Sequence, residues 1–189
     1  MKARRIVVTA LFAALLAALS PLALPVGPIP LTLASFVVYL MGAALPPRLA
    51  LSAVGVYILL GAAGLPVFSG FSGGLAKLFG PTGGFIFGYL PCAALTSLIS
   101  RRFQSRRGLI VAVLCGTAAL YLCGSLWYHA VTKASPRVVL ITCVVPFLPG
   151  DALKILAAAA VGPVLKRRLA AGAINREVER RVEDSHESS

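Results

Sequence analysis

Long apolar stretches separated by short polar segments dominate this chain of 189 residues. Six apolar runs can be marked, at residues 6–24, 31–45, 49–64, 81–100, 109–130 and 138–165. A helix needs about 20 mostly apolar residues to cross a bilayer, and only the second and third runs are clearly shorter. Pro46-Pro47-Arg48 separates these two and predicts a corner rather than one long helix. The pattern predicts an all-α integral membrane protein with six transmembrane helices.

Composition agrees with a membrane-embedded bundle. Hydrophobic residues make up 58% of the chain and charged residues only 13%, about half of the share in soluble domains. We therefore expect one transmembrane domain over residues 1–168. Residues 169–189 alternate basic and acidic side chains, which predicts a short charged cytoplasmic tail.

The positions of the basic residues predict the orientation. The formal net charge is +12, and most of the 18 Lys and Arg residues fall into clusters between alternate apolar runs. With six spans, these clusters all lie on the side of the N-terminus, which the positive-inside rule makes cytoplasmic. Both termini are then cytoplasmic and the connection 65–80 lies outside. The clusters are interpreted as orientation signals in contact with membrane lipid and not as a nucleic-acid surface.

Asp151 and Lys154 are the only charged residues in the last apolar run. A charge at membrane depth costs about 2.5–3.5 kcal/mol on insertion scales and by default marks a function. At a spacing of three, the two side chains share one helix face and offer an anion and a cation to a small polar ligand. The alternative is a structural ion pair that locks two helices together. Pro146 and Pro149-Gly150 predict a break in the helix at this place.

The connection 65–80 is rich in glycine and phenylalanine. Glycine lets the backbone turn sharply and approach a ligand closely, while the phenylalanine side chains supply apolar walls. We interpret it as a lid over a pocket that opens outward; an ordinary flexible loop is the alternative.

Ala10, Ala14 and Ala18 recur at steps of four in the first run. Small residues at this spacing allow two membrane helices to approach closely, although alanine is also common simply because it favours helix.

Several chemical signatures are absent from the sequence. It contains no G-x-x-x-x-G-K-[ST] phosphate loop and no H-E-x-x-H or G-x-S-x-G motif. Its four cysteines form no C-x-x-C pair, which argues against a zinc or redox site. Asp151 is the only carboxylate in the apolar runs. The sequence therefore predicts a protein that is not an enzyme, with no metal and no cofactor.

An ordered set of short motifs resembles the BioY family over roughly residues 5–165. The motifs are IPLTL at 29–33, GAAGLPVF at 61–68, GG at 73–74, GPTGG at 80–84 and PGD-x-x-K at 149–154. BioY proteins are the biotin-specific substrate-binding subunits, or S-components, of energy-coupling factor (ECF) transporters. The resemblance implies a six-helix bundle in the bacterial cytoplasmic membrane that captures biotin from outside. It also implies a transmembrane coupling subunit and two cytoplasmic ATPase subunits as partners, with ATP used only by the latter.

The resemblance also assigns residues. Asp151 and Lys154 match the pair that binds the ureido end of biotin, and Ala10, Ala14 and Ala18 match the surface that docks onto the coupling subunit. The loop 68–74 is expected to close over the ligand. Further expected substrate-binding residues lie in this loop and just after it: Phe71, Ser72, Gly73, Lys77, Thr82 and Phe85.

Two positions depart from the family pattern. Ala34 stands where glutamine is frequent in the family. Some relatives carry an arginine for the valerate carboxylate where this chain has Ile86. We hypothesise that Lys77 supplies that charge, aided by Ser72 and Thr82, rather than serving only as a solvated lysine. Two other functions stay open at this point. One is a standalone transporter of biotin or a related acid, in which Asp151 and Lys154 relay protons; the other is a membrane scaffold.

Overall fold

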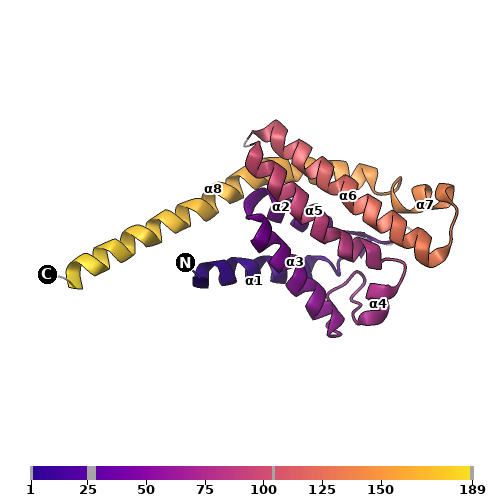
Figure 1. Cartoon of the computed structure of the whole chain (residues 1–189), viewed down its shortest axis with the longest axis horizontal. Coiled ribbons are helices and arrows are strands. Elements are labelled where there is room, and N and C mark those ends of the chain that lie inside the picture. The colour runs from indigo at the N-terminus through magenta and orange to yellow at the C-terminus, as the bar shows by residue number, and fades with distance from the viewer. Residues whose placement is uncertain (1, 25–28, 104, 188–189) are drawn as a thin grey trace.

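The computed structural model describes residues 2–24, 29–103 and 105–187, and nearly all of its regular structure is helical (Figure 1). The helices are α1 (Lys2–Leu19), α2 (Ala34–Ala44), α3 (Pro47–Ala62), α4 (Leu75–Phe79), α5 (Gly83–Arg102), α6 (Arg106–Thr132), α7 (Pro136–Cys143) and α8 (Leu148–Glu187). Strands β1 (Ala23–Leu24) and β2 (Leu31–Thr32) pair antiparallel between α1 and α2.

Each apolar run of the sequence overlaps a helix. The first five runs correspond to α1, α2, α3, α5 and α6, and the sixth holds α7 and the first part of α8. Within the described residues, the stretches Gly83–Arg102, Arg106–Thr132 and Pro136–Leu169 are long and apolar enough to cross a membrane, while α2 and α3 are shorter apolar helices. The chain is thus an all-α, multi-pass membrane protein. Six crossings and two cytoplasmic termini stay predictions.

Local chemistry explains several helix ends. Pro47 occupies the first turn of α3 and Pro136 the first turn of α7, where the missing N–H group costs nothing. At the start of α6, the Ser105 hydroxyl accepts a hydrogen bond from the Gly108 N–H at 3.0 Å. Lys133 ends α6 in the left-handed conformation, at φ 56°.

Helix α2 runs through the centre of the bundle and packs against α5 and α8. Val37, Val38 and Tyr39 are fully buried there. Helices α5 and α6 pack closely because glycines face their partners: a Cβ atom at Gly84 would collide with Trp127, and one at Gly124 with Phe85. This close approach holds Phe85 against α6, beside the site described below.

The connection 65–80 is tied to the bundle. The Phe68 ring is fully buried, edge-on to Tyr57 at 5.4 Å between ring centres, and it fills the space beside Gly61. The Gly74 N–H donates to the Gly61 carbonyl at 2.7 Å. Phe71, by contrast, is 67% exposed, with φ 54°. The connection therefore has a fastened base and an exposed tip, and its closure over a ligand stays a prediction.

Candidate functional site

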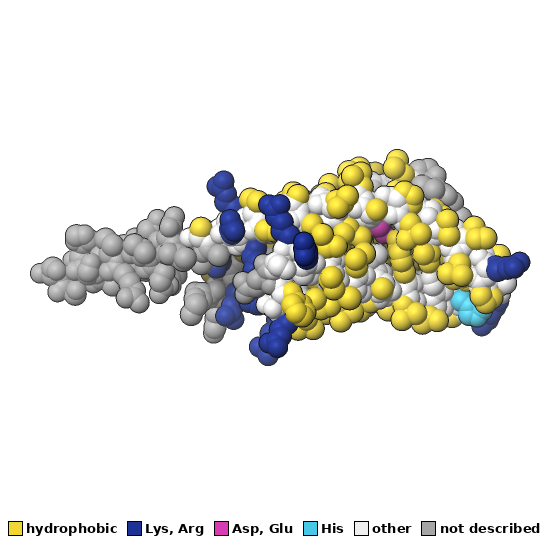
Figure 2. Space-filling view, turned by 90° about the horizontal axis from the view of Figure 1, so that it is seen from above, with side chains coloured by type: hydrophobic (Ala, Val, Ile, Leu, Met, Phe, Trp, Pro, Cys, Tyr) yellow, Lys and Arg dark blue, Asp and Glu magenta, His cyan; other side chains and the backbone are white. Residues whose placement is uncertain are grey.

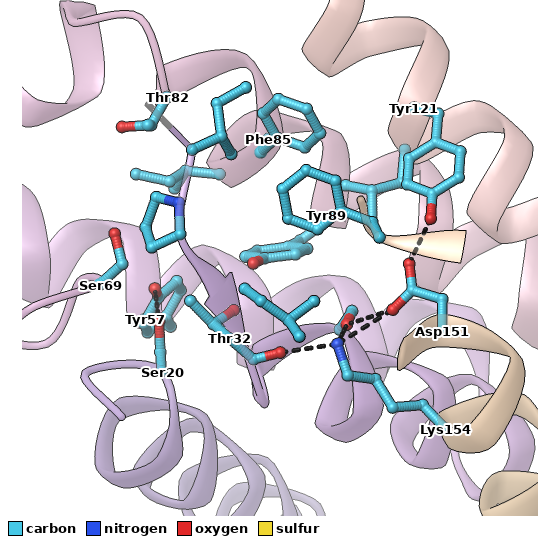
Figure 3. A pocket seen from close by; sticks show the side chains of 17 residues that line it. Ser20, Thr32, Tyr57, Ser69, Thr82, Phe85, Tyr89, Tyr121, Asp151 and Lys154 are labelled. Atoms are coloured by element: carbon cyan, nitrogen blue, oxygen red, sulfur yellow. Dashed lines mark hydrogen bonds and ion pairs between the residues drawn. The ribbon is translucent and has the colours of Figure 1, made fainter. Parts of the chain in front are cut away.

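A small cavity of about 50 Å³ lies among α2, α3, α5, α6 and the start of α8. Figure 3 shows Asp151 and Lys154 on one side of this cavity and Thr82 and Phe85 on another. The segment Ile29–Thr32, which carries the first motif, forms part of the wall. The cavity thus brings together residues that lie more than a hundred positions apart in the sequence.

Asp151 and Lys154 form an ion pair in the wall of the cavity. The Lys154 Nζ atom lies 3.0 Å from Asp151 Oδ1 and donates to the Thr32 carbonyl at 2.8 Å and to Ser35 Oγ at 2.9 Å (Figure 3). An ammonium group carries three N–H donors, so all three have acceptors. The charge is therefore solvated by protein groups in place of water.

Asp151 is 4% exposed, and its carboxylate, like the Lys154 ammonium, is held by hydrogen bonds from the protein. The Tyr121 hydroxyl donates to Oδ2 at 2.6 Å, and the Ser35 hydroxyl donates to Oδ1 at 3.4 Å. Hydrogen bonds to an ionised group are stronger than those between neutral groups, which offsets the cost of burying the charge. Two helices other than α8, namely α2 and α6, thus hold the carboxylate in place.

The backbone positions this pair at the beginning of a helix. Turn residues 144–147 separate α7 from α8, and the Asp151 N–H donates to the Phe147 carbonyl at 2.8 Å. Asp151 therefore stands in the first turn of α8, where the positive end of the helix dipole stabilises a negative charge. The break predicted from Pro146 and Pro149-Gly150 lies one turn before the carboxylate.

Aromatic side chains form the rest of the wall. The Phe85 and Phe147 rings lie 6.2 Å apart at 33°. The Tyr57 hydroxyl is 2.6 Å from the Ser20 hydroxyl, and Tyr89 lies between Tyr57 and the Asp151 side of the cavity (Figure 3). The wall is thus mainly apolar with a few fixed polar groups, as is usual for small-molecule sites.

The structure brings together only part of the set expected from the sequence. Asp151, Lys154, Thr82 and Phe85 line the cavity. Phe71, Ser72, Gly73 and Lys77 do not line it, although Ser69 of the same connection does. The Ser72 hydroxyl donates to the Ser69 carbonyl at 2.8 Å, and Lys77 lies on α4. The involvement of these four residues in ligand binding stays a prediction.

Sequence reasoning missed Ser35 and Tyr121, which bind the ion pair. Ser35 lies two residues after the quoted IPLTL segment, and Tyr121 is an isolated tyrosine within an apolar run. Their residue types did not predict a role at the site, because serine and tyrosine are tolerated at many depths of a membrane helix. Thr32 belonged to a quoted motif, which was a signal that this segment lies at the site.

The cavity and its elements can be compared with known proteins. The sequence matches the BioY family over residues 1–171. The chain belongs to the BioY family. A BioY relative from Pyrococcus horikoshii, named a probable biotin transporter, is 36% identical over 169 residues, which cover 89% of this chain and 98% of the relative. The biotin transporter BioY of Thermotoga maritima is 33% identical, covering 87% of this chain and 96% of the relative.

The fold of this BioY-family chain also resembles a solved structure. The crystal structure of the S-component for biotin from an ECF-type ABC transporter superimposes with a TM-score of 0.81 at 26% identity, over 88% of this chain and 92% of that one. The family is one of transporters and not of enzymes.

The described residues contain no cluster of His, Cys, Asp and Glu that could hold a metal ion.

Proposed function

We propose that this chain captures biotin from outside the cell as the substrate-binding subunit of an ATP-driven ECF-type importer in the bacterial cytoplasmic membrane. The observation that carries the proposal is the buried ion pair of Asp151 and Lys154 at a cavity, in a chain of the BioY family. A ureido group presents two N–H donors and one carbonyl acceptor. A carboxylate beside an ammonium offers the complementary groups.

The hydrogen bonds already present indicate how the ligand would be accommodated. Each carboxylate oxygen has two lone pairs, so Asp151 Oδ2 can accept a ligand N–H without releasing Tyr121. Lys154 has no spare donor, so the ligand carbonyl must replace one of its three acceptors. The Ser35 hydroxyl is suited to give way, because it still donates to Asp151 Oδ1 when Lys154 no longer donates to it.

The cavity must enlarge when biotin enters. At about 50 Å³ it is well below the roughly 300–1,000 Å³ of ordinary ligand pockets. Movement of the exposed tip of the connection 65–80 would make this space. On this proposal Phe71, Ser72 and Gly73 meet the ligand only when the tip closes again.

The partner surface is proposed on α1. Ala10, Ala14 and Ala18 are all exposed, while Phe12 and Leu16 on the opposite face are buried in the core. The small exposed face would let a helix of the coupling subunit approach closely. Two cytoplasmic ATPase subunits would supply the energy, and this chain would need no cofactor of its own.

Equilibrium binding to the purified protein tests the ligand. We expect biotin and desthiobiotin, which share the ureido group, to bind. Lipoate has a comparable carboxylate chain but no ureido group and serves as the matched control. Equal binding of lipoate would show that the ion pair does not recognise a ureido group. No binding of any of the three would refute the proposed substrate.

Uptake tests the partners. Labelled biotin should accumulate in a biotin-uptake-deficient host only when the coupling subunit and both ATPases are supplied together with this chain. Accumulation with this chain alone would favour a standalone transporter.

A further inference from the structure

A second and larger hollow lies away from the biotin cavity, among the first turns of α1, the corner between α2 and α3, the end of α5 and the middle of α8. Its volume is about 380 Å³. Four basic residues line it: Arg4 and Arg5 from α1, Arg101 from α5 and Lys166 from α8. Lys166 is fifteen residues beyond Asp151 on the same helix, which separates the two sites by about 22 Å.

No nearby acid offsets these four charges. Asp151 is the only acidic residue before Glu177 in the whole sequence, and it is paired with Lys154. Glu177 follows Lys166 by eleven residues, or about 16 Å along α8, on the part of the helix that extends beyond the bundle (Figure 1). Four like charges in one hollow repel each other, so an anion placed between them is strongly favoured.

The remaining wall of the hollow is apolar. Val8, Leu45, Leu49 and Leu169 stand beside the four cations. Figure 2 shows Lys and Arg side chains gathered at the end of the hydrophobic body from which α8 extends, with a smaller group at the opposite end. A ligand that fits such a wall has an anionic head and an apolar chain, and a soluble anion would leave the apolar part unused.

Orientation signals alone do not account for the hollow. Arg48, Arg102, Arg106 and Arg107 fulfil the same positive-inside role and are exposed without lining it. Arg4, by contrast, is half-buried and donates a hydrogen bond to the Leu169 carbonyl, which joins α1 to α8 at the hollow. The four lining residues are thus held around one space by three different helices.

We propose that this basic hollow binds the head group of an anionic phospholipid, with the phosphate among Arg4, Arg5, Arg101 and Lys166 and the lipid chain along Val8 and Leu49. Basic pockets between transmembrane helices on the cytoplasmic side bind anionic lipid head groups in other proteins. The bound lipid would join α1, which carries the proposed docking face, to α8, which carries the biotin-binding pair.

Native mass spectrometry of the purified protein with phosphatidylglycerol and phosphatidylcholine tests this proposal. We expect the wild type to retain phosphatidylglycerol preferentially. The double variant R4Q/K166Q should lose that preference by roughly fivefold for each charge removed. The matched control R106Q/R107Q removes the same charge at the same end and should keep it. Biotin binding should be unchanged in both variants, which verifies that they are folded.

The possible outcomes separate the alternatives. Equal losses in R4Q/K166Q and R106Q/R107Q would mean that the lipid responds to the general surface charge, and the hollow would not be a site. Displacement of the lipid by inorganic phosphate at millimolar concentration would point to a soluble anion. Normal lipid retention with impaired uptake in R4Q/K166Q would assign the hollow to a partner protein. Each of these results would overturn the proposal.

Discussion

Lys154 and Asp151 are each surrounded by groups that bind only their charged forms. The ammonium has acceptors from α2, from the segment before it and from α8, and the carboxylate has donors from α2, α6 and α8. A buried charge that loses its partner is left with a desolvation cost that nothing offsets. The pair is therefore sensitive to substitution at either member.

Asp151→Ala or Lys154→Ala should each weaken biotin binding by more than about 1.5 kcal/mol, because each removes a ligand contact and leaves the other charge unpaired. Isothermal titration of folded protein measures this. Arg137→Ala, an exposed cation outside the cavity, is the control and should bind normally. Near-normal binding by either Asp151→Ala or Lys154→Ala would assign the pair a purely structural role.

Tyr121→Phe should lower the free energy of unfolding by about 1.5–3 kcal/mol, since the hydroxyl donates to a buried carboxylate. Saturating biotin should recover part of this loss, because a ligand N–H can replace the missing donor. Thermal unfolding in detergent with and without biotin measures both effects. Tyr128→Phe, two turns further along α6, is the matched control. If both variants lost equal stability, the Asp151 contact would not be the cause.

Lys77 provides a test of how the ligand carboxylate is held. Among the described residues that line the cavity, Lys154 is the only cation, and Lys77 lies on α4 outside the lining. Comparison of biotin with its uncharged amide, biotinamide, in wild type and Lys77→Ala measures the contribution of Lys77. If Lys77 pairs with the ligand carboxylate, the wild type should prefer biotin and Lys77→Ala should largely lose that preference. An unchanged preference in the variant would mean that the carboxylate is held elsewhere or left in water.

The sequence predicted the charged residues of the site but not the uncharged residues that form hydrogen bonds with them. Asp151 and Lys154 are conspicuous because a charge in an apolar run is costly, whatever the fold. Ser35 and Tyr121 carry no such cost, so only the arrangement of α2 and α6 around α8 shows that they face the pair. Phe71 and Lys77 were expected at the site because of their positions in a motif-rich loop; they do not line the cavity, and their contact with a ligand stays a prediction.

At the scale of helices, α1 presents two different faces. Phe12, Ala13 and Leu16 are buried against the bundle, while Ala10, Ala14 and Ala18 are exposed. Exposed alanines offer little side-chain surface to lipid but leave the backbone accessible to a partner helix.

Ala14→Leu should leave biotin binding unchanged and reduce uptake, because a larger side chain keeps a partner helix at a distance without reaching the cavity. Ala118→Leu is the matched control, since Ala118 is exposed on α6. Binding to the purified protein and uptake in the complete transporter are measured for both. A loss of binding in Ala14→Leu would indicate misfolding, and undiminished uptake would exclude this face as the docking surface.

The positions of the long helices followed from the length of the apolar runs, because lipid leaves few alternatives to helix for such a run. The details between them did not. The pairing of β1 with β2, the short helix α4 and the anchoring of Phe68 beside Gly61 all depend on contacts between segments distant in sequence. The division of the last run into α7 and α8 was indicated by Pro146, which lies within the turn at residues 144–147.

For the molecule as a whole, the end of the bundle that carries the basic hollow predicts which side of the membrane it faces. The basic hollow gathers residues from α1, α5 and α8 at one end of the bundle, and the N-terminus and α8 point to the same side in Figure 1. Reporter fusions at Arg102 and at Ser72 should therefore report opposite sides of the membrane, with Arg102 cytoplasmic. If both fusions reported the same side, the arrangement with six crossings would be wrong.

Helix α8 is continuous from Leu148 to Glu187, which amounts to about 60 Å. Its first turns hold the charged pair, and its far part extends beyond the bundle (Figure 1). An α-helix is stiff along its axis, so we expect a displacement of the projecting part to reach the turn that carries the carboxylate and the ammonium. Pro163 lies between the two and leaves the backbone ladder one bond short, so any bending there reduces the motion that is transmitted. We therefore expect ligand binding to respond to displacement of the projecting part.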